Sequence, residues 1–138
     1  KGAVKAYETA ADRYHDRKDI AADAMHRAAE TYYKQAKTAE YDQGISTKAI
    51  DTYSDFISLY PDDARVDDSR KKIENLRGEQ ARGAMEVAGY YEKRKKWSGA
   101  LVYYNEVLVK APNSVYAEEA KRKIEELKAR MQEANASK

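Results

Sequence analysis

The apolar positions of this chain recur every three or four residues, the spacing that gathers side chains on one face of an α-helix. The clearest segment, residues 49–61, reads A-I-D-T-Y-S-D-F-I-S-L-Y-P. Ala49, Tyr53 and Phe56 follow the helical period, and Pro61 ends the helix because it cannot donate a backbone hydrogen bond. Across the whole chain the pattern predicts six helices, at 2–16, 20–42, 46–60, 64–95, 98–111 and 115–134.

The segment at 49–61 is one copy of a repeat. Residues 100–112 carry the same alanine, tyrosine, apolar residue and proline at an offset of 51, and a weaker copy at 3–15 has His15 in place of the proline. The small alanine lets a neighbouring helix approach closely, and helical repeats of this kind stack on one another. Duplication of a helical unit is therefore predicted.

The spacing of alanine, tyrosine, apolar residue and proline resembles the tetratricopeptide repeat. That resemblance implies an all-α fold, a right-handed helical solenoid of about six antiparallel helices, in a single domain spanning 1–138. The chain begins at Lys1 inside a helical pattern, so we expect a fragment of a longer precursor.

The predicted helix at 64–95 is unusually long, with Gly78 and Gly83 near its middle. A glycine in a helix interior costs up to about 1 kcal/mol relative to alanine. One bent helix, or two helices with a turn near Gly78, are both compatible with the pattern. Turns between the helices are predicted at 16–19, 42–47, 61–63, 93–96 and 112–114.

Composition narrows the classes of function. The 138 residues carry 26 basic and 24 acidic side chains, a net charge of +2, which gives no electrostatic case for binding nucleic acid. The absence of cysteine excludes a disulfide framework and a cysteine metal site. No apolar run approaches the roughly 20 residues that span a bilayer.

The sequence offers no catalytic chemistry. No constellation of serine, cysteine or histidine supports nucleophilic catalysis, so we expect no enzyme and no cofactor. His15 and His26 are interpreted as structural or surface residues, because neither is expected to lie in a zinc-type pattern with a second histidine or a carboxylate four residues on. The acidic pairs at 62–63 and 67–68 lack a calcium-loop pattern and are interpreted as N-cap and first-turn residues.

Twelve tyrosines, with one phenylalanine and one tryptophan, are an unusual proportion. Six of the tyrosines are expected to pack between repeats with the hydroxyl at the edge of the core. A tyrosine-lined groove for peptides is the alternative, and it fits best where two tyrosines are adjacent and one ring must face outward. The expected packing residues are Tyr7, Tyr14, Tyr33, Tyr53, Tyr91 and Tyr104, and the pairs are at 32–33, 90–91 and 103–104.

A cluster of cations lies beside the only tryptophan, in the turn predicted at 93–96. A solvated turn that compensates the carbonyl end of the preceding helix is one interpretation. The other is a protein-docking site, since arginine beside an aromatic ring is typical of interface hot spots. The candidate partner-binding residues are Tyr90, Lys93, Arg94, Lys95, Lys96 and Trp97.

A narrower resemblance covers about residues 39–128. The segments A-E-Y-D-Q at 39–43, L-R-G-E-Q-A-R at 76–82 and G-Y-Y-E-K-R-K-K-W-S-G-A-L at 89–101, together with the repeat at 49–61, resemble the C-terminal part of the BamD family. Ala111 departs from the tyrosine or phenylalanine usual before the proline, and the family's N-terminal repeats and lipid-anchored cysteine are not in this sequence.

The resemblance implies a periplasmic lipoprotein of the machinery that assembles outer-membrane β-barrel proteins. It implies a non-enzymatic scaffold whose C-terminal part contacts the barrel-forming subunit, and Arg94 is the position carried over for that contact. Unfolded outer-membrane protein peptides are implied as further partners, and a lipid anchor on the full-length protein as the attachment to the outer membrane.

Two alternatives remain at this stage. The chain could be a tetratricopeptide scaffold of another envelope or cytoplasmic complex, or a helical accessory domain of a larger enzyme.

Overall fold

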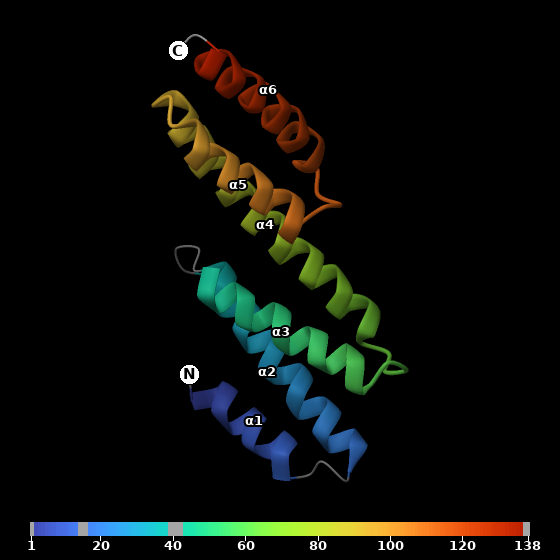
Figure 1. Ribbon diagram of the computed structural model, residues 1–138. Helices are drawn as coiled ribbons and strands as arrows, with labels where there is room; N and C mark the ends of the chain where they lie inside the picture. The colour runs from blue at the N-terminus through green and yellow to red at the C-terminus, as the bar shows by residue number, and fades with distance from the viewer. Residues whose placement is uncertain (1, 14–16, 39–42, 137–138) are drawn as a thin grey trace. The chain divides into compact units, whose positions relative to one another are not determined.

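The computed structural model describes residues 2–13, 17–38 and 43–136, and over these residues the chain is helical, with no strand (Figure 1). The predicted all-α fold is confirmed, and the paired helices are consistent with a tetratricopeptide-like helical solenoid. The helices are α1 (Gly2–Arg13), α2 (Lys18–Thr38), α3 (Gln43–Leu59), α4 (Val66–Lys93), α5 (Trp97–Lys110) and α6 (Ala117–Ala136).

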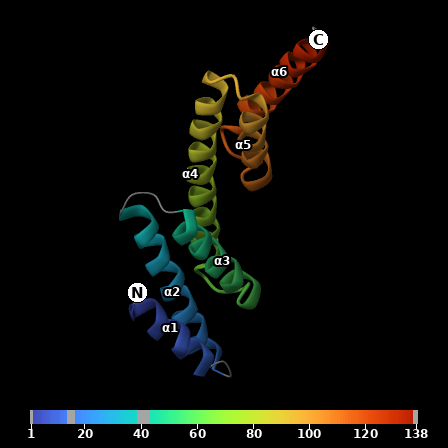
Figure 2. The same ribbon diagram turned by 60° about the vertical axis from the view of Figure 1, so that its left-hand side comes forward.

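The chain divides into two compact units, Lys1–Leu76 and Arg77–Lys138. Helices α1, α2 and α3 of the first unit lie side by side in both ribbon views (Figures 1 and 2). Tyr53 and Phe56 of α3 are fully buried there, as the repeat pattern predicts. Alanines of α2 pack against them and allow the close approach of the helices. The expectation of one domain over 1–138 stays a prediction.

The second unit consists of the later part of α4 with α5 and α6. Its core contains Ala100, Tyr104 and Val107 of α5, which are the equivalents of Ala49, Tyr53 and Phe56. The two repeat copies therefore bury the same helical face. Tyr14, another tyrosine expected to pack, lies outside the described residues.

The open question about 64–95 is answered by one continuous helix, α4 (Val66–Lys93). A β-carbon added at Gly78 or Gly83 would meet no atom within 4 Å. Neither glycine is therefore required for close packing, and neither ends the helix. Because the first part of α4 packs in one unit and the second part in the other, core contacts compensate for the low helix propensity of glycine.

The helix limits agree with those predicted from the sequence, apart from a few terminal residues. The predicted turn at 42–47 is wrong, because α3 begins at Gln43. Ser46 is fully buried in this first turn, so tertiary packing extends the helix through Gly44 despite its low propensity. The predicted helical residues 14–16 and 39–42 lie outside the described part of the chain.

Candidate docking site

The basic turn, residues 93–96, connects α4 to α5 and has a well-defined hydrogen-bond geometry. The amide of Lys96 donates to the carbonyl of Tyr91 at 3.0 Å, and the amide of Lys95 donates to that of Glu92 at 2.9 Å. These two bonds form a Schellman motif, which ends a helix with one residue in the left-handed conformation. That residue is Lys95, with φ of 60°, where glycine is the usual choice.

Arg94 lies over the ring of an exposed tyrosine at this turn. Its guanidinium carbon lies 3.6 Å from the centre of the Tyr90 ring, and Tyr90 is 53% exposed. A guanidinium stacked on a ring keeps its outward N–H groups available and loses little conformational freedom when a partner binds. The structure thus brings together two of the predicted site residues, Tyr90 and Arg94.

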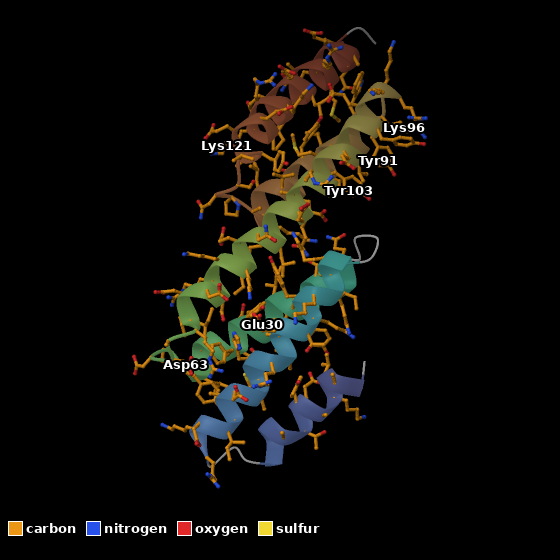
Figure 3. All side chains as sticks on the ribbon, turned by 180° about the vertical axis from the view of Figure 1, so that it is seen from behind. Glu30, Asp63, Tyr91, Lys96, Tyr103 and Lys121 are labelled. Carbon is orange, nitrogen blue, oxygen red and sulfur yellow. The ribbon has the colours of Figure 1, made fainter. Side chains whose placement is uncertain are left out.

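A row of aromatic rings continues from Tyr90 into the unit. The rings of Tyr90 and Tyr91 meet edge to face with centres 5.8 Å apart, and Tyr91 stacks on Tyr103 of α5 at 5.7 Å. Figure 3 shows Tyr91 and Tyr103 together, with Lys96 at the adjacent turn. Gly99 makes room for this stack, because a β-carbon there would lie 3.2 Å from the Tyr91 ring. The row joins the turn to α5.

The remaining predicted site residues lie around the same turn. The side chains of Lys93, Lys95 and Lys96 are exposed. Trp97 is half-buried against the core of the second unit, and its cationic neighbour is Arg130 of α6, 5.5 Å from the ring. Trp97 therefore anchors the start of α5, while Tyr90 is the aromatic group presented with Arg94.

Sequence reasoning missed a triad of glutamate, tyrosine and lysine in the first unit. The hydroxyl of Tyr53 donates to a carboxylate oxygen of Glu30, and Lys72 donates to both oxygens of Glu30 at 2.7 Å. Partial burial alone would raise the pKa of Glu30, but the bonds from Lys72 and Tyr53 outweigh it and lower that pKa. The triad connects α2, α3 and α4.

The second unit contains an equivalent triad. Tyr104 donates to Glu92 at 2.7 Å, and Lys123 donates to the other oxygen of Glu92 at 3.1 Å. Burial and the Glu92 carboxylate raise the pKa of Tyr104, so its hydroxyl remains a donor. The 51-residue offset links the tyrosines and the lysines, but Glu30 and Glu92 differ by 62 positions. A search at one fixed offset therefore finds only two members of each triad.

The comparison with known families decides the identity. Residues 3–111 match the YfiO family, which is described as outer membrane lipoprotein.

The chain belongs to the YfiO family of outer membrane lipoproteins.

No match was found among curated proteins. The resemblance to the BamD family is confirmed, since YfiO is this family. The matched residues of this YfiO-family chain include the basic turn and both tyrosines of the triads. No helix in the described part of the chain combines the length and the apolar character needed to cross a membrane.

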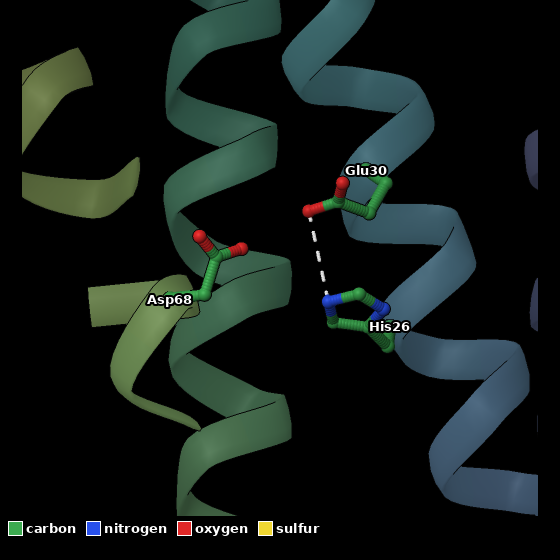
Figure 4. Close-up of side chains that lie close together, drawn as sticks. All are labelled: His26, Glu30 and Asp68. Carbon is green, nitrogen blue, oxygen red and sulfur yellow. Dashed lines mark ion pairs between the residues drawn. The ribbon is translucent and has the colours of Figure 1, made fainter. Parts of the chain in front are cut away.

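One cluster in this YfiO-family chain has ligand types that suit a metal. His26, Glu30 and Asp68 place one ligand atom each within 4.8 Å of one another (Figure 4). The expectation that His26 has no carboxylate four residues on is wrong, because Glu30 stands there, with Oε2 at 3.6 Å from Nε2. However, the Lys72 ammonium already lies between the two carboxylates, 2.7 Å from Glu30 and 3.1 Å from Asp68. A cation would have to displace it, so the arrangement favours an ion-pair network.

Proposed function

We propose that this chain is a non-enzymatic scaffold in the assembly of outer-membrane β-barrel proteins. In this proposal the full-length protein is held at the periplasmic side of the outer membrane by a lipid anchor. The basic turn and Tyr90 form a docking site for the barrel-forming subunit of the assembly machinery. Unfolded outer-membrane protein peptides are proposed as further partners.

The observation that carries the proposal is the fixed Arg94 on the exposed Tyr90 ring. The guanidinium at 3.6 Å from the ring centre is preorganised, which lowers the entropic cost of forming an interface. Arginine and tyrosine are among the residue types enriched in interface hot spots. Lys93, Lys95 and Lys96 surround the pair and would draw an acidic surface toward it.

The backbone at Lys95 supports the same interpretation. A non-glycine residue in the left-handed region costs about 1–2 kcal/mol, and the cost is commonly tolerated at functional sites. A glycine at this position would remove the strain but also the charge. We therefore propose that Lys95 serves binding at the expense of stability.

The test is capture of partners from a Gram-negative envelope extract by the immobilised protein, with bound proteins identified by mass spectrometry. Wild-type protein is expected to retain the barrel-forming subunit, and Arg94→Glu to lose it while keeping its melting temperature. Lys121→Glu makes the same charge change on α6, away from the turn, and is the control (Figure 3). Equal retention by Arg94→Glu and wild type would refute the docking site.

A further inference from the structure

A cavity of about 510 Å³ lies in the second unit between α4 and α6, with Tyr104 among the residues that line it. Met85, Gly89 and Tyr116 contribute to its lining, and three carboxylates and three cations complete it. This is a size that holds a bulky side chain. The basic turn touches it only through Lys93, so it is a separate feature of the surface.

The equivalent place in the first unit is a smaller pocket of about 370 Å³, lined mainly by charged and polar side chains. Glu30 and Glu92 occupy the same position in the two triads, so α2 corresponds to the second part of α4 at an offset of 62. At this offset the large His26 and Arg27 become Ala88 and Gly89. The α4 wall of the groove therefore carries smaller side chains than the equivalent wall formed by α2.

An ion pair of the first unit is also replaced in the second unit. Arg65, which precedes α4, donates to Asp23 of α2 at 3.0 Å and lies over the Phe56 ring at 5.5 Å. The equivalent of Arg65 is Tyr116, at an offset of 51, and the equivalent of Asp23 is Met85. An ion pair is thus exchanged for two largely apolar side chains, and the groove of the second unit is the larger of the two. Methionine and tyrosine both pack well against an aromatic ring.

The rim of the groove carries Glu119, which lies in the first turn of α6. Asp68 of the first unit pairs with Lys72 at 3.1 Å, but its equivalent Glu119 has no ion-pair or hydrogen-bond partner among the described residues. Lys123, four residues after Glu119, bonds to Glu92. Met85 and Tyr116, next to a carboxylate without a cationic partner among the described residues, are complementary to a large apolar side chain with a basic neighbour.

We propose that the groove between α4 and α6 binds an extended segment of a partner protein. The segment inserts one large apolar side chain between Met85 and Tyr116 and places an adjacent lysine or arginine against Glu119. Arg82 is already paired with Glu86 at 2.8 Å and does not compete for Glu119. The site does not depend on docking at Arg94.

The test is an NMR titration of the ¹⁵N-labelled protein with a capped ten-residue Gly/Ser peptide that contains a central Phe-Lys pair. Shifts are expected at Met85, Gly89 and Glu119. An Ala-Lys peptide should bind at least about tenfold more weakly, because burying a phenylalanine contributes about 1.5–3 kcal/mol. A Phe-Glu peptide should also bind more weakly than Phe-Lys.

Variants of the chain make the test specific. Gly89→Arg restores the residue that stands in α2 and should abolish binding, whereas Gly83→Arg on the same helix should not. A β-carbon meets no atom within 4 Å at either glycine, so both variants are expected to fold. Glu119→Lys should favour the Phe-Glu peptide, and Glu118→Lys is its control. Arg94→Glu should leave the titration unchanged, which separates this site from the docking turn.

Three results would overturn the proposal. They are no shifts at millimolar peptide, equal binding by Gly89→Arg and wild type, or preference of the wild type for the Phe-Glu peptide. Shifts at the same residues that depend on protein concentration without peptide would show that a second copy of the chain occupies the groove, and would also overturn it.

Discussion

At the scale of single residues, the hydroxyls of Tyr53 and Tyr104 do more than the repeat pattern requires. A phenylalanine would fill the same volume, yet each hydroxyl donates to a glutamate that also binds a lysine. A hydrogen bond to a charged group contributes more to stability than one between neutral groups. The repeat tyrosine therefore both packs and connects three helices.

Replacing these tyrosines by phenylalanine is expected to lower the free energy of unfolding by about 1–2 kcal/mol each, because a half-buried carboxylate loses a donor. Tyr53→Phe should be measured by helical circular dichroism in urea. Tyr104→Phe should also move the fluorescence transition of Trp97, the single tryptophan, which lies in the second unit. Tyr90→Phe is the matched control. Unchanged stability of both core variants would contradict this role.

At Gly99 the packing requires that no side chain be present. Gly99→Ala is expected to destabilise the protein by roughly 1 kcal/mol, because its β-carbon would press on the Tyr91 ring at 3.2 Å. Gly83→Ala, in an open position of α4, should instead stabilise it by up to about 1 kcal/mol. Urea midpoints of the two variants measure the contrast. A gain in stability with Gly99→Ala would contradict this, because it would show that the stacked rings of Tyr91 and Tyr103 move aside without an energetic cost.

At the scale of elements, the end of α4 is set by the left-handed Lys95. Lys95→Gly is expected to raise the free energy of unfolding by about 0.5–1 kcal/mol, since it relieves the backbone conformation. Lys96→Gly removes the same charge at a residue with φ of −93° and should give no gain. Denaturant titrations of the pair test this. If both variants behave alike, the strain at Lys95 is not energetically significant.

The connection from α3 to α4 depends on Asp63. Hydrogen bonds from Arg65 hold the pKa of Asp63 at about 2, below its ordinary value of 3.8. The lowered pKa adds stability that is present above pH 3.8 and is lost as the pH falls toward about 2. Between these values the unfolded chain binds the proton more readily than the folded one.

Asp63→Asn is therefore expected to be less stable than wild type near pH 6, and the difference should shrink as the pH falls from 3.8 to about 2. Urea unfolding at several pH values measures it, with Asp62→Asn at the exposed neighbour as control. A difference that stays constant over this range would show that the Arg65 contact does not depend on the Asp63 charge.

The sequence was sufficient to predict the helices but not the side-chain hydrogen bonds that connect them. Ala49, Tyr53 and Phe56 predict a buried face because a single helix period determines it. Glu30 could not be assigned to Tyr53 in the same way, because the intervening connection is 11 residues longer than that between Glu92 and Tyr104, as their separations of 23 and 12 show. The partner of His26, in contrast, was visible at the i+4 position and was overlooked.

For the basic turn, the sequence predicted which residues lie together but not which aromatic ring each cation contacts. Arg94 and Trp97 are close in sequence, yet the guanidinium lies on Tyr90, and Trp97 packs against the core with Arg130 nearby. The choice depends on the Schellman turn, which reverses the chain after Arg94. Such backbone geometry is set by tertiary context, because nothing in a run of lysines marks the left-handed residue.

At the scale of the whole molecule, this YfiO-family chain combines two similarly braced units with different surfaces. The groove of the first unit has a volume of about 370 Å³ and is lined by charged side chains such as Arg65. The groove of the second unit has a volume of about 510 Å³ with Met85 and Tyr116 in its wall, and this unit also carries the basic turn. The proposed contacts with partners are thus gathered in the residues after Leu76. In this account the repeat core supplies a rigid support, and sequence differences between the copies supply recognition.

The central claim is that Arg94 on Tyr90 docks the barrel-forming subunit. The most direct measurement is calorimetric titration of the purified periplasmic domain of that subunit into the wild type, Arg94→Glu and Lys121→Glu, at two salt concentrations. The account predicts that Arg94→Glu weakens binding at least about 30-fold, as expected for a hot-spot residue costing 2 kcal/mol or more, while Lys121→Glu binds like wild type. Equal affinity of the two variants, with both folded, would contradict it.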